Sequence, residues 1–209
     1  MYKKMDEAAM TQLLETGIEE FSEAGLDRAN INTIAKKAGV SVGVIYKYFK
    51  DKDAFFLECV RYSLRTLDEV LDNVFGKHAD LRTLLIDVIH ALQDHAKKYP
   101  KMNVMYNEIT SGSTRKYAAV LANEIEERSA VIYKGVFENA IKAGVVKDSF
   151  DPKLLAFFLD NLLVMLQFSY SCDYYNERMK IFLGEELKGD NEAIAEGMAD
   201  LIINAVMKQ

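Results

Sequence analysis

The sequence has few residues that interrupt helices. It contains two prolines and eleven glycines among 209 residues, and tight turns depend heavily on these two residue types. A protein built from many short strands needs such turns at regular intervals. The scarcity therefore argues against an all-β protein and favours long helices.

Cysteine is also scarce. Cys59 and Cys172 stand far apart and match no metal-binding spacing. The N-terminal segment has no apolar core of the kind that a secretory signal peptide carries. We therefore expect free thiols in a reducing cytoplasm rather than a disulfide. A chain of this length can bury a core without that cross-link.

Long apolar runs are missing as well. The most apolar stretch, 154–170, is shorter than the about 20 residues that a membrane-spanning helix needs, and it contains Asp160, Asn161 and Gln167. We therefore expect a cytoplasmic protein without a membrane partner.

Signatures of enzymatic sites are absent. The chain has no glycine-rich phosphate loop, HExxH, GxSxG or cysteine–histidine signature. His90 and His95 are five residues apart, so they do not share the helix face that an i, i+4 metal pair requires. Core, capping or surface roles are expected for both. We expect no enzyme, no metal and no cofactor.

Apolar residues recur at helical spacing through nearly the whole chain, and no segment shows the alternation of a strand. The sequence therefore predicts an all-α protein. Long helices are expected from Met10 to Gly25, from Phe56 to Gly76, from Leu81 to the residues before Tyr99, over about 115–143, over 152–175, and along the stripe from Ile194 to Ala205.

The segment 25–51 differs, because it predicts two short helices. Asn30, Ser41 and Asp51 are good N-cap residues for three successive helices. Gly39 lies between the two short ones, where a turn needs a positive φ. Apolar residues that could pack these helices together are Ile34, Ala35, Val40 and Ile45. The pattern indicates a helix-turn-helix, although two arbitrary short helices in a bundle are the alternative.

The sequence of this segment resembles that of the DNA-binding domain of the TetR family of bacterial repressors. The matching pieces are F-x-x-x-G-L at 21–26, I-A-x-x-A-G-V-S-x-G-x-I-Y-x-Y-F at 34–49 and K-D-x-F at 52–55, in one register without a gap. The resemblance covers about 8–57. Two positions depart from it: Ala29 replaces a common threonine, and Thr33 replaces an acid that often completes a capping box.

The resemblance implies that 41–48 is a recognition helix in the major groove of DNA. Val42, Gly43 and Lys47 are then expected near the bases, with Lys47 donating to guanine and Val42 contacting a thymine methyl group. The expected phosphate contacts are Ser41, Tyr46, Tyr48 and Lys52, while Asn32, Thr33 and Lys36 would reach the backbone or flanking bases. The alternative for Tyr46 and Tyr48 is packing against the first helix; Phe49 is assigned to the core.

Charge is distributed in agreement with this placement. The segment 28–52 has six basic residues and one acidic residue, a formal charge of +5, whereas the rest of the chain carries −11. The overall charge of −6 therefore conceals a basic segment suited to phosphate. We expect a DNA-binding domain over 1–52 and a helical effector-binding and dimerisation domain over 53–209.

The resemblance implies that the larger domain dimerises through its C-terminal helices and binds a small molecule. The helix 152–175 and the stripe Ile194, Met198, Leu201 and Ile202 are the candidate interface; a monomeric core is the alternative. The segment 170–184 either extends that helix or covers the end of the bundle. Candidate ligand contacts, which are otherwise plain core, are Met102, Met105, Tyr106, Tyr133, Phe137, Asn161, Met165, Gln167 and Phe168.

The predicted function is a transcriptional regulator, a repressor that binds a palindromic operator as a homodimer and is released by a small apolar or amphipathic effector. The competing interpretation is a helical ligand-binding or interaction protein that does not touch DNA. A third class, an all-α enzyme, is nominated by no set of residues.

Overall fold

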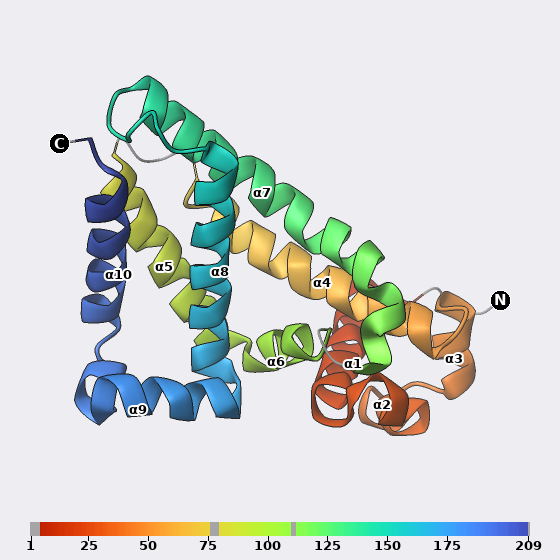
Figure 1. Cartoon of the computed structure of the whole chain (residues 1–209). Coiled ribbons are helices and arrows are strands. Elements are labelled where there is room, and N and C mark those ends of the chain that lie inside the picture. Colours follow the sequence, from red (N-terminus) through yellow and green to blue (C-terminus); the bar gives the residue numbers. More distant parts are fainter. Residues whose placement is uncertain (1–4, 76–79, 110–111, 209) are drawn as a thin grey trace. The chain divides into compact units, whose positions relative to one another are not determined.

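A computed structural model describes residues 5–75, 80–109 and 112–208 (Figure 1). Every element in these ranges is a helix, which confirms the all-α prediction. The elements are α1 (Glu7–Arg28), α2 (Ile31–Lys37), α3 (Val42–Tyr48), α4 (Lys52–Asp72), α5 (Leu81–Lys98), α6 (Pro100–Ile109), the 3₁₀ helix η1 (Gly112–Tyr117), α7 (Ala118–Lys142), α8 (Pro152–Ser171), α9 (Asp173–Gly189) and α10 (Asn191–Val206).

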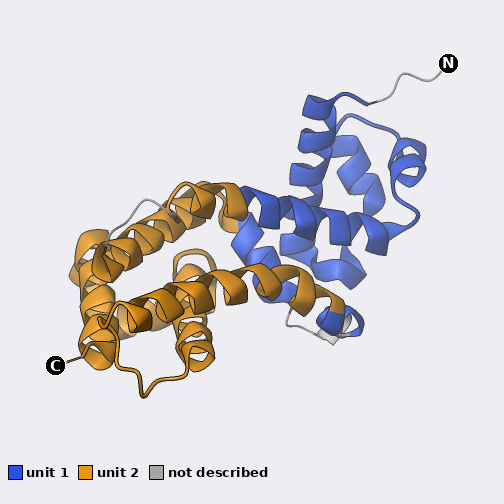
Figure 2. Cartoon of the chain, turned by 90° about the horizontal axis from the view of Figure 1, so that it is seen from above, with its two compact units in different colours: residues 1–66, 101–119 blue, residues 67–100, 120–209 orange. Residues whose placement is uncertain are grey.

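The chain forms two compact units, coloured separately in Figure 2. Unit 1 consists of Met1–Thr66 and Lys101–Ala119, and unit 2 of Leu67–Pro100 and Val120–Gln209. Helix α4 begins in unit 1 and ends in unit 2. The functional boundary that we predict between residues 52 and 53 lies at the start of α4, inside unit 1, and it stays a prediction.

Aromatic side chains hold the core of unit 1. Phe21 of α1 contacts two residues of α4: its ring centroid lies 5.8 Å from that of Phe55 and 5.2 Å from that of Phe56, the second pair edge to face. Such pairs contribute about 0.5–1.5 kcal/mol beyond their buried area. The ring centroid of Phe49, the C-cap residue of α3, lies 4.8 Å from that of Phe55 with the rings tilted by 42°, so α3 contacts the same core.

Helix α5 organises unit 2, because both α8 and α10 pack against it. Ile202 of α10 is only 8% exposed and belongs to this core. The prediction that Ile202 lies in a dimer interface is therefore wrong. The apolar stripe of α10 is wide, and the part that contains Ile202 packs into the core of unit 2. Arg128 joins α7 to the C-terminal half of α4 through Asp68, at 2.7 Å, and Asp72.

The helix predicted over 152–175 ends earlier, at Ser171. Cys172 is extended, and α9 starts at Asp173 as a separate helix across the end of unit 2 (Figure 1). Two contacts stabilise the junction between α8 and α9. The Asn176 side-chain amide donates to the Ser169 carbonyl oxygen, and the centroid of the Tyr175 ring lies 5.5 Å from that of Phe168. The segment 170–184 thus covers the bundle's end instead of extending α8.

Other boundaries also differ from those predicted. Helix α6 was not expected, and α7 starts at Ala118 because the residues before it form the 3₁₀ turn η1. Gly76, expected to end α4, lies outside the described residues. Helix α8 is long and apolar enough to cross a membrane by length and composition, a property that core helices of soluble proteins share.

Candidate nucleic-acid interface

Three side-chain caps shape the α2–turn–α3 segment, as predicted. The Asn32 backbone N–H donates to Asn30 Oδ1 (2.9 Å), the Val44 N–H to Ser41 Oγ (3.3 Å) and the Ala54 N–H to Asp51 Oδ1 (2.7 Å). Each cap pairs a backbone donor that the first turn of a helix leaves without a partner. The starts of α2, α3 and α4 are therefore set by local sequence.

The turn and the packing beneath it also agree with the sequence. Gly39 has φ +69°, a conformation that costs glycine little and other residues more. Ile34 of α2 and Ile45 of α3 are fully buried, and Val40 is half-buried. Buried Ile45 fixes which face of α3 points inward.

The opposite face of α3 is open. The segment predicted to be a recognition helix forms α3, Val42–Tyr48, with Ser41 as its N-cap. Gly43 and Lys47 are exposed, Tyr46 is 47% exposed, and Val42 is half-buried. The exposed face of the helix therefore presents the side chains of Lys47 and Tyr46 and the backbone at Gly43.

Tyr48 has a structural contact of its own. Its phenolic oxygen accepts a hydrogen bond of 2.6 Å from the Met5 backbone N–H, just before α1, and the side chain is half-buried. This contact agrees with the packing alternative, yet the phenolic hydrogen is still able to donate to a phosphate. Tyr46 is exposed, and its predicted phosphate contact stays a prediction.

Lys52 is held by the end of α1. Its ammonium group donates to the carbonyl oxygens of Asp27 (2.8 Å) and Ala29 (3.2 Å). Lys52 therefore caps carbonyl groups that α1 leaves unpaired, a role that the sequence did not indicate. Its predicted phosphate contact stays a prediction.

Helix α2 contributes exposed polar groups one turn apart. Asn32 and Lys36 are exposed and Thr33 is half-buried; residues four apart share a helix face. Glu20 of α1, absent from the predicted site, accepts the Asn30 N–H at 3.0 Å and so positions the start of α2. No local spacing signals this contact, because ten residues separate the pair.

The predicted effector contacts are dispersed. Met102, Met105 and Tyr106 belong to α6 in unit 1, whereas the other six belong to unit 2. Within unit 2, Tyr133, Phe137, Gln167 and Phe168 are buried, and Asn161 and Met165 lie on the exposed face of α8. Whether any of them binds a ligand stays a prediction.

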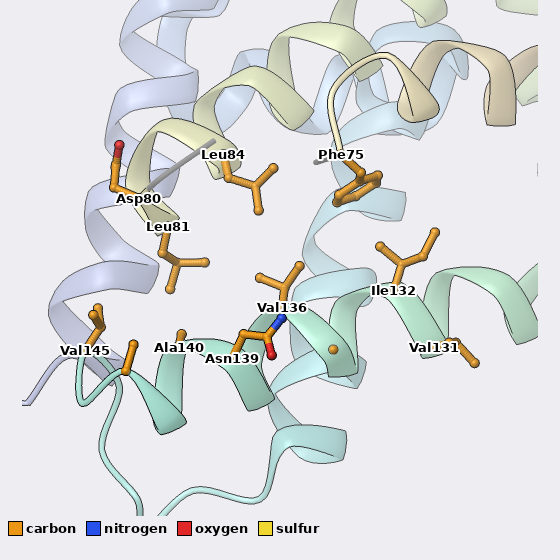
Figure 3. Close-up of a pocket in the computed structure, with 12 residues that line it drawn as sticks. Phe75, Asp80, Leu81, Leu84, Val131, Ile132, Val136, Asn139, Ala140 and Val145 are labelled. Carbon is orange, nitrogen blue, oxygen red and sulfur yellow. The ribbon is translucent and has the colours of Figure 1, made fainter. Parts of the chain in front are cut away.

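Unit 2 contains a cavity of about 570 Å³ that none of these nine residues lines (Figure 3). Its walls come from the chain after α4, the start of α5 and the C-terminal half of α7 through Val145. Twelve residues line it: Phe75, Asp80, Leu81, Leu84, Val131, Ile132, Gly135, Val136, Asn139, Ala140, Ala143 and Val145.

The two histidines of α5 have separate environments. His90 Nε2 lies 3.2 Å from the Glu192 carboxylate near the surface. His95 is buried against Tyr99, and neither of its ring nitrogens has a hydrogen-bond partner among the residues that the structure describes. Among the described residues no cluster of His, Cys, Asp and Glu is suited to hold a metal ion.

Known proteins resemble this chain in sequence, most strongly at its N-terminus. Residues 13–59 match the model of the bacterial regulatory proteins of the tetR family. The chain is 26% identical over 159 residues, 76% of its length, to the uncharacterized HTH-type transcriptional regulator YhgD of Bacillus subtilis, covering 82% of that protein. It is 42% identical to the regulator BetI of Yersinia pestis over 60 residues, 29% of this chain and 30% of BetI.

Solved structures share the fold over nearly the full length. FadR of Bacillus subtilis, a transcriptional regulator solved with stearoyl-CoA, gives a TM-score of 0.72 at 19% identity, covering 93% of this chain and 97% of FadR. The ketosteroid transcriptional regulator KstR2 of Mycobacterium tuberculosis gives 0.68 at 17% identity, covering 99% and 98%. Because residues 13–59 match the tetR-family model and the chain is similar to HTH-type regulators, it belongs to the TetR family and is a DNA-binding transcriptional regulator.

Proposed function

We propose that the protein is a dimeric repressor that leaves its operator when a small apolar or amphipathic effector binds in the larger domain. The observation that supports operator recognition is the exposed face of α3, held outward by buried Ile45. Its place of action would be the cytoplasm, where the DNA is.

Base recognition would come from the first two turns of α3. Lys47 would donate to guanine in the major groove, and Val42 would contact a thymine methyl group. Ser41, Tyr46 and Tyr48 would bind phosphates and set the register. Because the segment 28–52 carries +5, affinity should fall as the salt concentration rises.

Dimerisation would use the outer face of α8. Phe157 and Phe158 are 60% and 57% exposed, and Leu154, Leu162 and Met165 extend this apolar stripe along the helix. A row of five exposed apolar side chains on one helix is typical of an interaction site. A dimer with two-fold symmetry would match the symmetry of a palindromic operator. Ile181 and Phe182 of α9 and Leu201 of α10, also exposed, would widen the interface.

Release would follow from a change in the dimer. In one arrangement the two recognition helices lie roughly one turn of DNA apart; the effector favours another arrangement in which they do not. Operator and effector would then weaken each other's binding by the same factor. The relative FadR, solved with stearoyl-CoA, supports a ligand-binding role for this kind of domain.

Operator binding is tested by selecting DNA fragments with the wild-type protein and measuring affinity at several salt concentrations. Lys47→Ala and Tyr46→Ala should each reduce affinity for the selected DNA about tenfold or more, whereas Lys153→Ala, a change at an exposed lysine of unit 2, should not. If both α3 variants bind as tightly as wild type, the assignment of α3 is wrong. If no sequence is selected, the alternative without DNA binding gains support.

The dimer surface is tested separately by sedimentation. Phe157→Glu places a charge on an already exposed position, so the fold should persist while the dimer dissociates. Val120→Glu, a change at an exposed valine of α7, serves as the control. A Phe157→Glu variant that sediments as a wild-type dimer would show that α8 is not the interface.

A further inference from the structure

We propose that Lys50, in the turn between α3 and α4, is a further DNA contact whose ammonium group binds a backbone phosphate whatever the base sequence. The segment 28–52 contains six basic residues, and within the chain three of them already have structural roles. The inference rests on the proposed docking of α3 on DNA. It follows from asking which of the six positive charges the fold leaves for a partner.

Two of the basic residues bind carbonyl groups near the end of α1. The Arg28 Nε–H donates to the Ala24 carbonyl oxygen at 3.1 Å. Lys52 Nζ donates to two further carbonyl oxygens, at 2.8 and 3.2 Å. Carbonyl groups at the C-terminus of a helix lack partners within that helix and carry partial negative charge. Arg28 and Lys52 therefore stabilise the end of α1.

A third basic residue, Lys37 of α2, is paired with an acid. Its ammonium group lies 3.3 Å from the Glu19 carboxylate of α1. Both side chains are partly exposed, so the pair adds little stability. The two opposite charges nevertheless compensate each other, and Lys37 brings little net positive charge to a phosphate.

The remaining basic residues, Lys36, Lys47 and Lys50, are exposed. Lys36 and Lys47 belong to the predicted DNA contacts, whereas Lys50 does not. Its side chain forms no ion pair or hydrogen bond with any residue that the structure describes. The acid beside it, Asp51, accepts the Ala54 N–H at 2.7 Å as the N-cap of α4. Lys50 thus keeps its positive charge for a partner.

The backbone directs Lys50 away from the core. Phe49 has extended φ and ψ angles of −126° and 127°, and its ring centroid lies 4.8 Å from that of Phe55. Successive side chains of an extended backbone point to opposite sides. Because Phe49 points inward, Lys50 points outward, just beyond the C-terminal end of α3.

This position suits a phosphate that flanks the bases read by α3. Three residues of chain separate Lys50 from Lys47, so their Cα atoms are at most roughly 11 Å apart. A lysine ammonium is a compact charge with three N–H donors on a flexible stem. Such a group binds phosphate without fixing which base lies beside it, and phosphate contacts carry no direct sequence information.

The proposal is tested by fluorescence anisotropy with the full chain, two duplexes of equal length and several KCl concentrations. One duplex carries the selected sequence and the other a scrambled sequence. Lys50→Ala should weaken binding to both by a similar factor, about threefold to tenfold. The slope of log affinity against log salt concentration should become shallower by about 0.9 for each bound subunit. Lys47→Ala should instead weaken binding mainly to the selected duplex.

Two variants serve as controls, and the melting temperature of each protein checks its fold. Lys37→Ala removes the same charge from the same segment and should leave the salt slope unchanged. Lys50→Arg keeps the charge and should retain the wild-type slope. A wild-type slope in Lys50→Ala, an equal flattening in Lys37→Ala, or a loss confined to the selected duplex would each overturn the proposal.

Failure of the Lys50 assignment is distinguishable from failure of the proposed docking. If Tyr46→Ala and Lys47→Ala weaken binding but Lys50→Ala does not, only Lys50 is wrongly assigned. If all three variants bind both duplexes as tightly as wild type, the docking of α3 is wrong as well. The scrambled duplex requires no operator, so the effect of Lys50 is measurable even where no sequence is selected.

Discussion

Gly17 of α1 and Phe55 of α4 approach so closely that a side chain at position 17 has no room. A Cβ atom on Gly17 would lie 2.6 Å from Phe55 Cζ and 2.7 Å from Cys59 Sγ. Phe55 is fully buried and its ring packs against that of Phe49, the C-cap residue of α3. The small size of Gly17 therefore allows the packing that supports α3.

We expect Gly17→Ala to lower the free energy of unfolding by about 1–3 kcal/mol, the usual cost of overpacking a core, even though alanine is the better helix former by about 1 kcal/mol. Urea unfolding followed by circular dichroism measures it. Gly197→Ala in α10 is the matched control, since its Cβ meets nothing within 4 Å and should stabilise. A Gly17→Ala protein as stable as wild type would contradict the packing described.

Gly43→Ala tests whether DNA approaches the backbone of α3. Within the chain, the added Cβ would meet only Ser41 Oγ, at an ordinary 3.8 Å, so stability should be kept. Operator affinity should fall about tenfold, equivalent to about 1.4 kcal/mol, if the methyl group occupies the place of the DNA. Unchanged affinity would remove Gly43 from the interface.

Asp160 of α8 should make stability depend on pH. Burial raises its pKa to about 6, and the Glu126 carboxylate adds to the effect. The folded state then holds the proton more tightly than the unfolded chain, so stability is lost as pH rises from about 4 through 6, by at most about 3 kcal/mol. Asp160→Asn should be more stable than wild type at pH 7.5 and should lose that advantage near pH 4. A difference that is independent of pH would contradict this, and the exposed Asp148→Asn is the control.

His95 should make stability depend on pH in the opposite sense to Asp160. Burial lowers its pKa to about 4, and nearby Lys98 contributes. Between pH 6.5 and 4 the unfolded chain binds the proton and the folded state does not, so stability falls as the solution is acidified through this range. His95→Phe keeps a ring against Tyr99 and should flatten this slope. Chemical unfolding at several pH values measures it; an unchanged slope would show that His95 does not titrate as described.

Both cysteines should be unreactive in the folded protein. Cys59 is fully buried, with a thiol pKa raised by that burial, and Cys172 is also buried. Because the thiolate is the reactive form, Ellman's reagent should react slowly with the native protein and count two thiols in denaturant. Rapid reaction of either thiol without denaturant would show that its segment opens.

Local signals in the sequence determined the helix-turn-helix. The caps at Asn30, Ser41 and Asp51 and the turn at Gly39 each act within a few residues, so a one-dimensional pattern contains them. The end of α8 was not predictable in this way: Cys172 is no helix breaker, and the corner depends on Tyr175 and Asn176 packing back onto α8.

Apolar spacing likewise determined that unit 2 is a helical bundle, but not which apolar residues line its cavity. Leu84 and Val136 at the cavity and Tyr133 and Phe137 in the core follow the same periodicity. Only the tertiary structure shows which of these residues line the cavity. It likewise shows that Lys52 donates to a carbonyl group at the end of α1. A helical period states which face of a helix is apolar, whereas the residues that fill or leave a space depend on how helices distant in sequence pack together.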